Sequence, residues 1–213
     1  GRYFKVSEPG LGWGGTAISN PLEILGPWNP KKGARPGMSL ELIVAAGFPR
    51  EASIIDIGGG ESRLVDALLE QGHSDITVLD LSSAALEVTR KRLGKRADDV
   101  KWIVGDATSW SPPASYDIWH DRAAFHFLTE AAERRAYMDR LRGALRPGGQ
   151  VIIGTFAPDG PEKCSGLPVM RHDADTLAAE LGPEFVLEDT RRHGHETPGG
   201  NIQHFQFSRF RRA

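Results

Sequence analysis

From Ser39 onward, short apolar runs alternate with stretches in which apolar side chains recur every three or four positions. The short runs predict buried strands, and the recurring pattern predicts helices that lie against them. The predicted strands are "SIIDI" (53–57), "DITVLD" (75–80), "VKWIVGD" (100–106), "YDIWHD" (116–121), "QVIIGTF" (150–156), "FVLEDTRR" (185–192) and "NIQHFQFSRF" (201–210).

The predicted helices lie before and between these strands, and Ser82 and Thr129 are suited to cap two of them. They cover residues 40–44, 62–71, 82–93, 129–145 and 173–181. Strands that alternate with helices predict an α/β fold, with a doubly wound, mostly parallel sheet and helices on both faces. No helix separates the last two strands, so we expect them to form an antiparallel hairpin at one edge.

Residues 1–38 differ from the rest because prolines and glycines recur throughout, which prevents long regular elements. The segment is either a partly ordered leader or a lid over a site, with Trp13 or Trp28 as an apolar anchor. Residues 39–213 have a suitable length for one domain and show no internal repeat.

Composition excludes several classes of partner. A net charge of −2 provides no basic field, so we expect no nucleic-acid partner. Cys164 is the single cysteine, which excludes an internal disulfide and is typical of a reducing compartment. No apolar run approaches the roughly 20 residues of a membrane span, and the start does not resemble a signal peptide. We therefore expect a cytoplasmic protein with no membrane partner, and the oligomeric state stays open.

Three consecutive glycines, Gly58, Gly59 and Gly60, follow the first strand directly. Without Cβ atoms the backbone can turn sharply there and approach a ligand closely, at the edge where open α/β sheets bind ligands. A dinucleotide-binding fold needs G-x-G-x-x-G, but Arg63 occupies the third glycine position. The pattern therefore disfavours a dehydrogenase.

An acidic residue lies at or near the end of each of the first three strands: Asp56, Asp80 and Asp106. A carboxylate after the second strand can accept hydrogen bonds from both hydroxyls of a ribose. A carboxylate after the third strand can accept a hydrogen bond from an exocyclic amine. The alternative is that each acid only caps the helix that follows.

With these residues the chain resembles the class I S-adenosylmethionine-dependent methyltransferases over residues 40–213. "IIDIGGGESRLVDAL" is similar to their first motif, "TVLDLSSAAL" to the ribose-binding acidic loop, "WIVGDAT" to the adenine-side motif, and "LRPGGQVII" to the approach to their fifth strand. The resemblance implies the strand order 3-2-1-4-5-7-6. It also implies S-adenosyl-L-methionine as methyl donor and S-adenosyl-L-homocysteine as product.

The resemblance further implies roles for individual residues. The glycines would pass along the methionine part of the donor, Asp80 would hold the ribose, and Asp106 would lie beside the adenine. Asp56 would order the glycine loop and the donor's amino group. The donor-binding residues expected on this basis are Asp56, Gly58, Gly59, Gly60, Asp80, Leu81, Asp106, Ala107 and His120.

The segment "WHDRAAFHFL" follows the fourth strand, where the acceptor would lie. It lacks the [D/N]-P-P-[Y/F/W] signature of many amino-methyltransferases and resembles the "HDRA-FHFL" stretch of a bacterial methyltransferase group. We expect His120 or Asp121 to accept a proton from the acceptor or to orient it, and Arg122 and His126 to line its pocket. The alternative is that Asp121 and Arg122 pair to brace the loop, while His126 faces the core.

Three further side chains are predicted at the same edge of the sheet: Cys164 after the fifth strand, and His193 and His195 after the sixth. Strand spacing would place the two histidines on one face. They complete the predicted substrate pocket, and the alternative is an ordinary loop cysteine with solvated surface histidines. The spacing of these residues is too loose for a typical metal site, so we expect no metal.

The leading hypothesis is methyl transfer to an N, S or O nucleophile of a small soluble acceptor, since no appended domain would recognise a polymer. A protein-lysine N-methyltransferase is the alternative enzyme, with a protein acceptor. A non-catalytic S-adenosylmethionine-binding regulatory module is the alternative of a different class.

Overall fold

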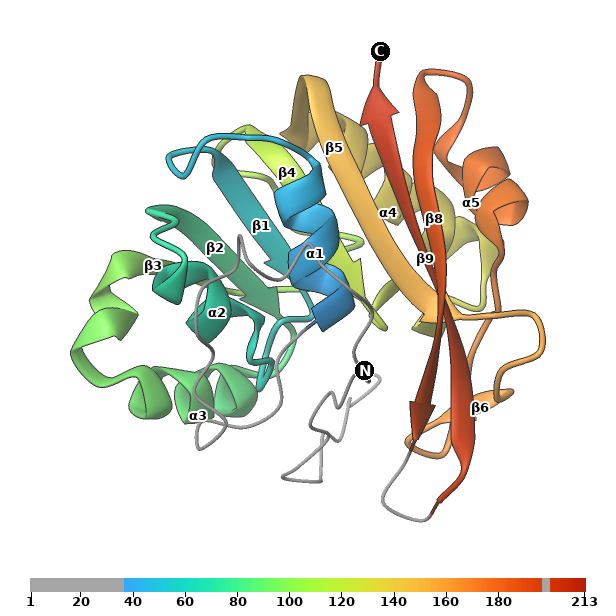
Figure 1. Cartoon of the computed structure of the whole chain (residues 1–213), viewed down its shortest axis with the longest axis horizontal. Coiled ribbons are helices and arrows are strands. Elements are labelled where there is room, and N and C mark those ends of the chain that lie inside the picture. The colour runs from blue at the N-terminus through green and yellow to red at the C-terminus, as the bar shows by residue number, and fades with distance from the viewer. Residues whose placement is uncertain (1–36, 197–199) are drawn as a thin grey trace.

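A computed structural model describes residues 37–196 and 200–213, and it contains a seven-stranded sheet in the order β3-β2-β1-β4-β5-β9-β8 (Figure 1). The strands are β1 Ser53–Ile57, β2 Asp75–Asp80, β3 Val100–Val104, β4 Tyr116–Arg122, β5 Leu145–Phe156, β8 Phe185–Glu196 and β9 Ile202–Arg212. Strands β1 to β5 pair in parallel, whereas β9 is antiparallel to both β5 and β8. Counted among these seven strands, the order is 3-2-1-4-5-7-6, which confirms the prediction.

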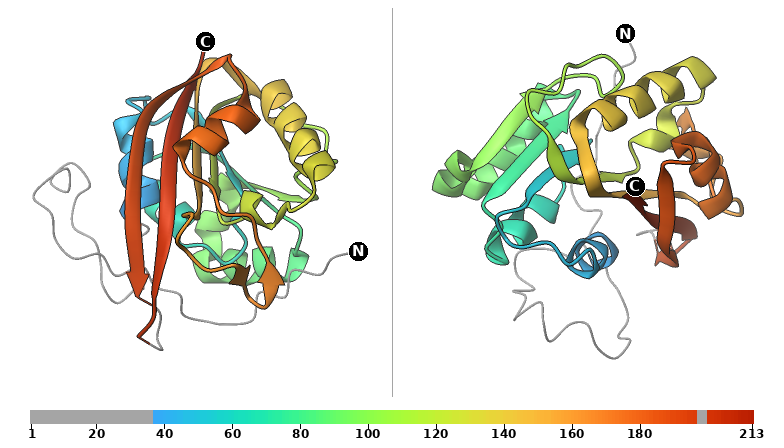
Figure 2. Two further views of the ribbon diagram at one scale, coloured as in Figure 1. Left: turned by 90° about the vertical axis from the view of Figure 1, so that its right-hand side faces the viewer. Right: turned by 90° about the horizontal axis from the view of Figure 1, so that it is seen from above.

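Helices cover both faces of the sheet (Figures 1 and 2). Helices α1 Gly37–Ala45, α2 Leu64–Glu70 and α3 Ser83–Leu93 contribute to a core cluster that includes Leu40, Leu68 and Leu86. Helices α4 Ala131–Ala144 and α5 Ala174–Leu181 contribute to a second cluster, with Tyr137 and Leu177. The remaining elements are the 3-10 helices η2 Gly94–Asp99 and η3 Phe125–Phe127 and the short strands β6 Lys163–Cys164 and β7 Leu167–Pro168.

Local sequence explains where most elements begin and end. Every residue of β1 is buried, as expected for a central strand with helices on both faces. The Ser82 hydroxyl accepts a hydrogen bond from the Ala85 N–H at 3.1 Å, which caps α3 as predicted. Gly182, with a φ of 94°, follows α5 in a conformation that favours glycine.

Two local predictions were wrong. The helix after β4 is capped by Glu130 rather than Thr129, because the Thr129 N–H is bonded to the Phe127 carbonyl in the preceding turn. This helix ends at Ala144, so Leu145 begins β5 instead of closing the helix. The loop after β5 contains the short β6–β7 hairpin.

The predicted leader or lid, residues 1–38, lies outside the described residues except for Gly37 and Met38, which begin α1. Among the described helices, none is both long and apolar enough to cross a membrane.

Candidate active site

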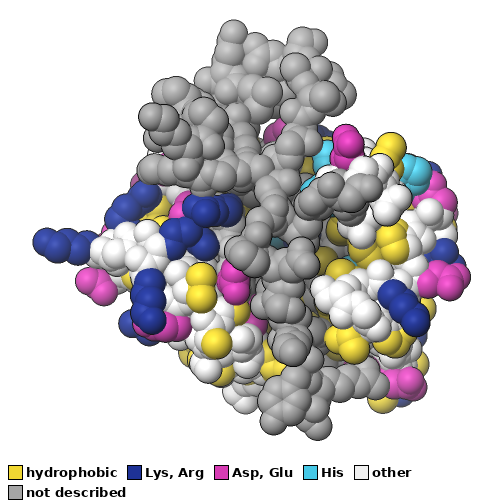
Figure 3. Space-filling view, turned by 90° about the horizontal axis from the view of Figure 1, so that it is seen from below, with side chains coloured by type: hydrophobic (Ala, Val, Ile, Leu, Met, Phe, Trp, Pro, Cys, Tyr) yellow, Lys and Arg dark blue, Asp and Glu magenta, His cyan; other side chains and the backbone are white. Residues whose placement is uncertain are grey.

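A pocket opens where β1 to β4 end, at the lower edge of the sheet in Figure 1. Figure 3 views the molecule from that side. The pocket combines loops that follow four neighbouring strands with the segment around η3. Its lining residues are Ile57, Gly58, Leu79, Asp80, Leu81, Gly105, Asp106, Ala107, Thr108, Ala123, Ala124, Phe127, Leu128 and Tyr137. Of the predicted donor-binding residues, Gly58, Asp80, Leu81, Asp106 and Ala107 therefore share one pocket.

The glycine loop is packed too closely for any side chain. Gly58 has a φ of 70°, and a Cβ there would lie 2.8 Å from the Ala124 Cβ. A Cβ on Gly59 would lie 2.5 Å from Asp56 Oδ2, and one on Gly60 would lie 2.7 Å from Asp80 Oδ2. The three glycines thus let the backbone pass between β1, β2 and the turn after β4.

Asp80 connects the glycine loop to the start of α3. Its Oδ2 accepts a hydrogen bond from the Gly60 N–H at 2.9 Å, and its Oδ1 accepts one from the Ser82 N–H at 2.7 Å. Burial raises the pKa of Asp80, and these two backbone hydrogen bonds oppose that rise. Each carboxylate oxygen has a second lone pair, so the group can still accept hydrogen bonds from a ligand.

Asp106 and Ala107 form the β3 side of the pocket. Asp106 is exposed, and its Oδ1 accepts hydrogen bonds from the Thr108 N–H at 2.8 Å and the Thr108 hydroxyl at 2.6 Å. The Gly105 N–H donates to the Asp80 carbonyl at 3.0 Å, which ties this loop to the end of β2.

Asp56, His120 and Ser39 form a buried hydrogen-bonded chain below the glycine loop. His120 Nδ1 lies 2.7 Å from Asp56 Oδ1, and His120 Nε2 lies 2.9 Å from the Ser39 Oγ. Register pairs Asp56 of β1 with His120 of β4, and Ser39 reaches them from α1. Asp56 Oδ2 is buried and has no hydrogen-bond partner within residues 37–196 and 200–213. His120 does not line the pocket, and both of its ring nitrogens are engaged in this chain.

Asp121 is fully buried and points to the opposite face of the sheet, toward α4. Its Oδ1 accepts from the Ala124 N–H at 2.9 Å, and its Oδ2 accepts from the Phe125 N–H at 3.0 Å and the Tyr137 hydroxyl at 2.7 Å. Burial raises the pKa of Asp121 to about 6. The carboxylate therefore holds the turn in which Ala123, with a φ of 64°, and Ala124 form a wall of the pocket.

Tyr137, Phe127 and Leu128 are pocket residues that the sequence analysis did not identify. Tyr137 lies within the helix predicted over residues 129–145. Because a buried tyrosine hydroxyl usually needs a hydrogen-bond partner, the sequence could have predicted a polar contact for Tyr137.

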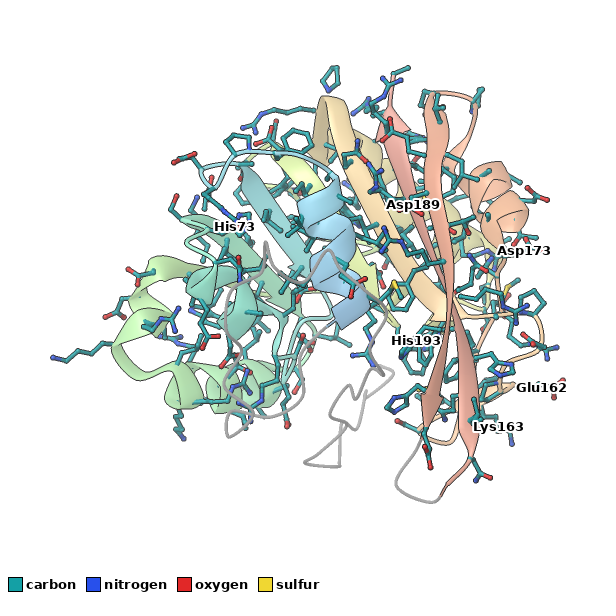
Figure 4. All side chains as sticks on the ribbon, in the orientation of Figure 1. His73, Glu162, Lys163, Asp173, Asp189 and His193 are labelled. Atoms are coloured by element: carbon teal, nitrogen blue, oxygen red, sulfur yellow. The ribbon has the colours of Figure 1, made fainter. Side chains whose placement is uncertain are left out.

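The predicted acceptor residues separate into two environments. Arg122 lies over the Phe205 ring, with its Cζ 5.7 Å from the ring centroid, and His193 is the register partner of Phe205 (Figure 4). His126 is instead fully buried, and neither ring nitrogen has a hydrogen-bond partner in the described part of the chain. Burial lowers the pKa of His126 to about 3, with His172 and Arg122 adding to the effect.

Cys164 and His195 lie near the same arginine. Cys164 is partly buried against the core cluster that contains Phe205, and burial raises the pKa of its thiol. His195 is buried, and burial followed by the charge of Arg122 lowers its pKa. Within the described residues, no three His, Cys, Asp or Glu side chains are arranged to hold a metal ion.

Comparison with known proteins adds to this geometry. Residues 54–149 match the family model described as a methyltransferase domain. Residues 54–149 thus form a methyltransferase domain, and the chain is similar to S-adenosylmethionine-dependent methyltransferases. The matched segment runs from β1 into the beginning of β5 and includes all the donor-binding residues predicted from the sequence.

The chain is similar to a malonyl-[acyl-carrier protein] O-methyltransferase of Paenibacillus sp. (strain JDR-2), to which it is 29% identical over 53% of this chain and 42% of the relative. A trans-aconitate 2-methyltransferase of Acidovorax sp. (strain JS42) is 28% identical over 73% of this chain and 54% of the relative. The chain thus spans about half the length of these curated relatives.

Among solved structures, the 1,6-didemethyltoxoflavin-N1-methyltransferase of Burkholderia thailandensis, with bound 1,6-didemethyltoxoflavin and S-adenosylhomocysteine, has a similar fold. The TM-score is 0.64 at 24% sequence identity, and the match covers 81% of this chain and 76% of the other.

Proposed function

We propose that this methyltransferase moves a methyl group from S-adenosyl-L-methionine to an N, S or O atom of a small acceptor. The observation that carries the proposal is the single pocket that brings together Gly58, Asp80, Leu81, Asp106 and Ala107. These residues lie at the ends of three different strands. A nucleoside with an attached amino acid would have its amino acid part beside Gly58, its ribose beside Asp80 and its adenine beside Asp106.

The residues present fit this donor. The glycine loop is a cradle that any Cβ would fill, which suits close approach of the methionine part. Asp80 would accept hydrogen bonds from the ribose hydroxyls, and Asp106 with Ala107 would lie beside the adenine. Asp56 Oδ2, buried and without a described partner, would accept from the amino group directly or through water.

The donor, when bound, supplies an electrophilic methyl carbon: an acceptor lone pair bonds to that carbon, the C–S electron pair stays on sulfur, and any acceptor proton leaves to a base or to water. The chain's own contribution is mainly to hold the reactants in line. We assign His120 and Asp121 to this work, because both are buried and hydrogen-bonded. His120 orients Asp56, and Asp121 fixes the turn at Ala123 and Ala124.

A small acceptor is supported by two similar proteins, whose names specify trans-aconitate and 1,6-didemethyltoxoflavin, whereas a third name specifies a malonyl group carried on an acyl-carrier protein. The segments after β4 and β5 that would surround an acceptor, residues 123–130 and 157–173, contain only η3 and the β6–β7 hairpin and form no additional domain.

Calorimetric titration with S-adenosylhomocysteine and, separately, with NAD tests the donor. We expect binding of the first and none of the second, and tight binding of NAD alone would overturn the proposal. A screen with tritium-labelled methyl donor against small acids, amines and thiols then tests turnover. Label in the small-molecule fraction supports the proposal, label in protein bands would favour a protein-lysine acceptor, and donor binding without any transfer would favour a regulatory module.

A further inference from the structure

Ser39 lies in α1, outside residues 54–149, which match the methyltransferase domain. Helix α1 packs on one face of the sheet, over β4 and β5 (Figure 1). The buried Ser39 hydroxyl lies 2.9 Å from His120 Nε2, and His120 Nδ1 lies 2.7 Å from Asp56 Oδ1. A side chain of α1 thus reaches a carboxylate of β1 through a single histidine.

The chemistry of the three groups assigns a direction to these hydrogen bonds. An ionised carboxylate can only accept, and in a neutral imidazole one ring nitrogen donates while the other accepts. His120 Nδ1 therefore donates to Asp56 Oδ1, and Nε2 accepts from the Ser39 hydroxyl. If the ring turned away, buried donors and acceptors would lose their partners, which is costly. Ser39 thus helps to fix both the tautomer and the orientation of His120.

The histidine leaves the second oxygen of Asp56 for a ligand. Asp56 Oδ2 is buried and has no hydrogen-bond partner among residues 37–196 and 200–213. It faces the glycine loop, because a Cβ on Gly59 would lie only 2.5 Å from it. The two residues after Asp56, Ile57 and Gly58, line the donor pocket. The ammonium group of a ligand, bound directly or through a water molecule, is the partner that matches the charge of this oxygen.

The orientation of Asp56 depends on the hydrogen bonds behind it. The torsion that exchanges the two oxygens of an aspartate is broad, so the carboxylate needs an external contact to hold it. The hydrogen bond to His120 holds Oδ1 and thereby keeps Oδ2 toward the glycine loop. Because hydrogen bonds weaken steeply with poor geometry, loss of Ser39 should weaken the contact with the donor's amino group. Contacts of the ribose and the adenine with Asp80 and Asp106 should remain.

We propose that Ser39 is a positioning residue of the donor site: through His120 it holds Asp56 in the orientation that recognises the amino group of the donor's methionine part. The inference rests on the proposed function, which places that amino group beside Asp56. Helix α1 thereby takes part in donor recognition, and the effect of Ser39 is confined to one group of the ligand.

The test compares the wild type and Ser39→Ala, both as the full chain, in calorimetric titrations with three ligands. S-adenosylhomocysteine carries the amino group and the carboxylate, S-adenosyl-4-thiobutanoate lacks the amino group, and S-adenosyl-3-thiopropylamine lacks the carboxylate. We expect the wild type to bind S-adenosylhomocysteine at least about tenfold more tightly than the ligand without the amino group. Ser39→Ala should reduce this ratio at least about fivefold, and should weaken both amino-bearing ligands by the same factor.

Two further variants separate positioning from a general loss of stability. Ile43→Val removes one methylene group from a buried position of the same helix, outside the hydrogen-bonded chain, and should leave the ratio unchanged. Ser39→Cys provides a second measurement if Ser39→Ala does not fold. The thiol is a weak donor of similar size, so the ratio should fall in the same direction.

An unchanged ratio in the Ser39 variants, whether the affinities fall together or stay the same, would overturn the inference and leave Ser39 with a role in stability alone. Equal binding of S-adenosylhomocysteine and S-adenosyl-4-thiobutanoate by the wild type would also overturn it, although such binding would still support the proposed function. Failure to bind S-adenosylhomocysteine would instead remove the proposed function itself.

Discussion

At the scale of single residues, Asp80 combines a structural and a binding role. Its two oxygens hold the backbone N–H groups of Gly60 and Ser82, and the same carboxylate lines the pocket. Asp80→Ala should therefore weaken S-adenosylhomocysteine binding by at least about 1.5–3 kcal/mol, the usual worth of hydrogen bonds to a charged group. Calorimetry measures the affinity. Asp75→Ala at the other end of β2 is the control, because Asp75 pairs with Lys101 away from the pocket, and it should leave the affinity unchanged. Equal affinities for all three proteins would mean that the ribose lies elsewhere.

Two glycines allow a matched comparison of crowded and open positions. A methyl group at Gly60 would lie 2.7 Å from Asp80 Oδ2 and 2.9 Å from the Ala85 Cβ, whereas nothing lies within 4 Å of one at Gly143. Gly60→Ala should abolish measurable donor binding and lower the free energy of unfolding. Gly143→Ala, inside α4, should instead raise the free energy of unfolding by about 0.5–1 kcal/mol, because alanine is the better helix former. Urea unfolding measures both, and donor binding by Gly60→Ala at wild-type affinity would contradict the assignment of the loop.

At the scale of elements, Ser39 connects α1 to the two central strands. Its hydroxyl is the partner of His120 Nε2, and His120 in turn orients Asp56. Ser39→Ala should lower the free energy of unfolding by about 1–3 kcal/mol, because it leaves a buried ring nitrogen without its partner. Ser74→Ala, at an exposed position, should change it by less than about 0.5 kcal/mol. Similar urea midpoints for the two variants would show that the hydrogen bonds linking Ser39, His120 and Asp56 contribute nothing to stability.

The sequence predicted those parts of the fold that depend on local pattern. All seven strands of the large sheet were predicted because each is a short apolar run, and the glycine and acid motifs mark where the first three end. The order of the strands was predicted from the resemblance to the methyltransferase family that these motifs carry. The pocket lining at Gly58, Asp80 and Asp106 follows from the same motifs.

Contacts between distant segments could not be predicted in this way. Ser39 meets His120 across 81 residues, and the Tyr137 hydroxyl reaches Asp121 across 16. A sequence pattern shows that Tyr137 faces the core, but it does not show which carboxylate it meets there. His120 and Asp121 were accordingly predicted to act on the acceptor, and that role remains a prediction. Their observed contacts are with Asp56, Ser39 and the turn after β4.

At the scale of the whole molecule, buried ionisable groups make stability depend on pH in two opposing ways. Burial lowers the pKa values of His126 and His73 to about 3 and about 4. As the pH falls below about 6.5, these histidines therefore become protonated in the unfolded chain but stay neutral in the folded protein. Their contribution to stability is therefore present above pH 6.5 and is lost on acidification. Asp121, with a pKa raised to about 6, acts in the opposite direction between about pH 4 and 6, because there the folded state holds the extra proton.

His126→Phe isolates one of these contributions. The ring packs between Phe127 and Phe156, with centroids 4.6 and 5.0 Å away, so an aromatic replacement suits the site. Between pH 6.5 and 5 the wild type should lose about 2 kcal/mol more of its free energy of unfolding than the variant, from about 1.4 kcal/mol per pH unit for one proton. Urea unfolding of both proteins at several pH values measures the difference, in which the contributions of Asp121 and His73 cancel. Parallel pH curves would show that His126 takes up its proton as readily in the folded protein as in the unfolded chain. A histidine in the apolar layer between η3 and β5 would then need a hydrogen-bond acceptor close to its ring.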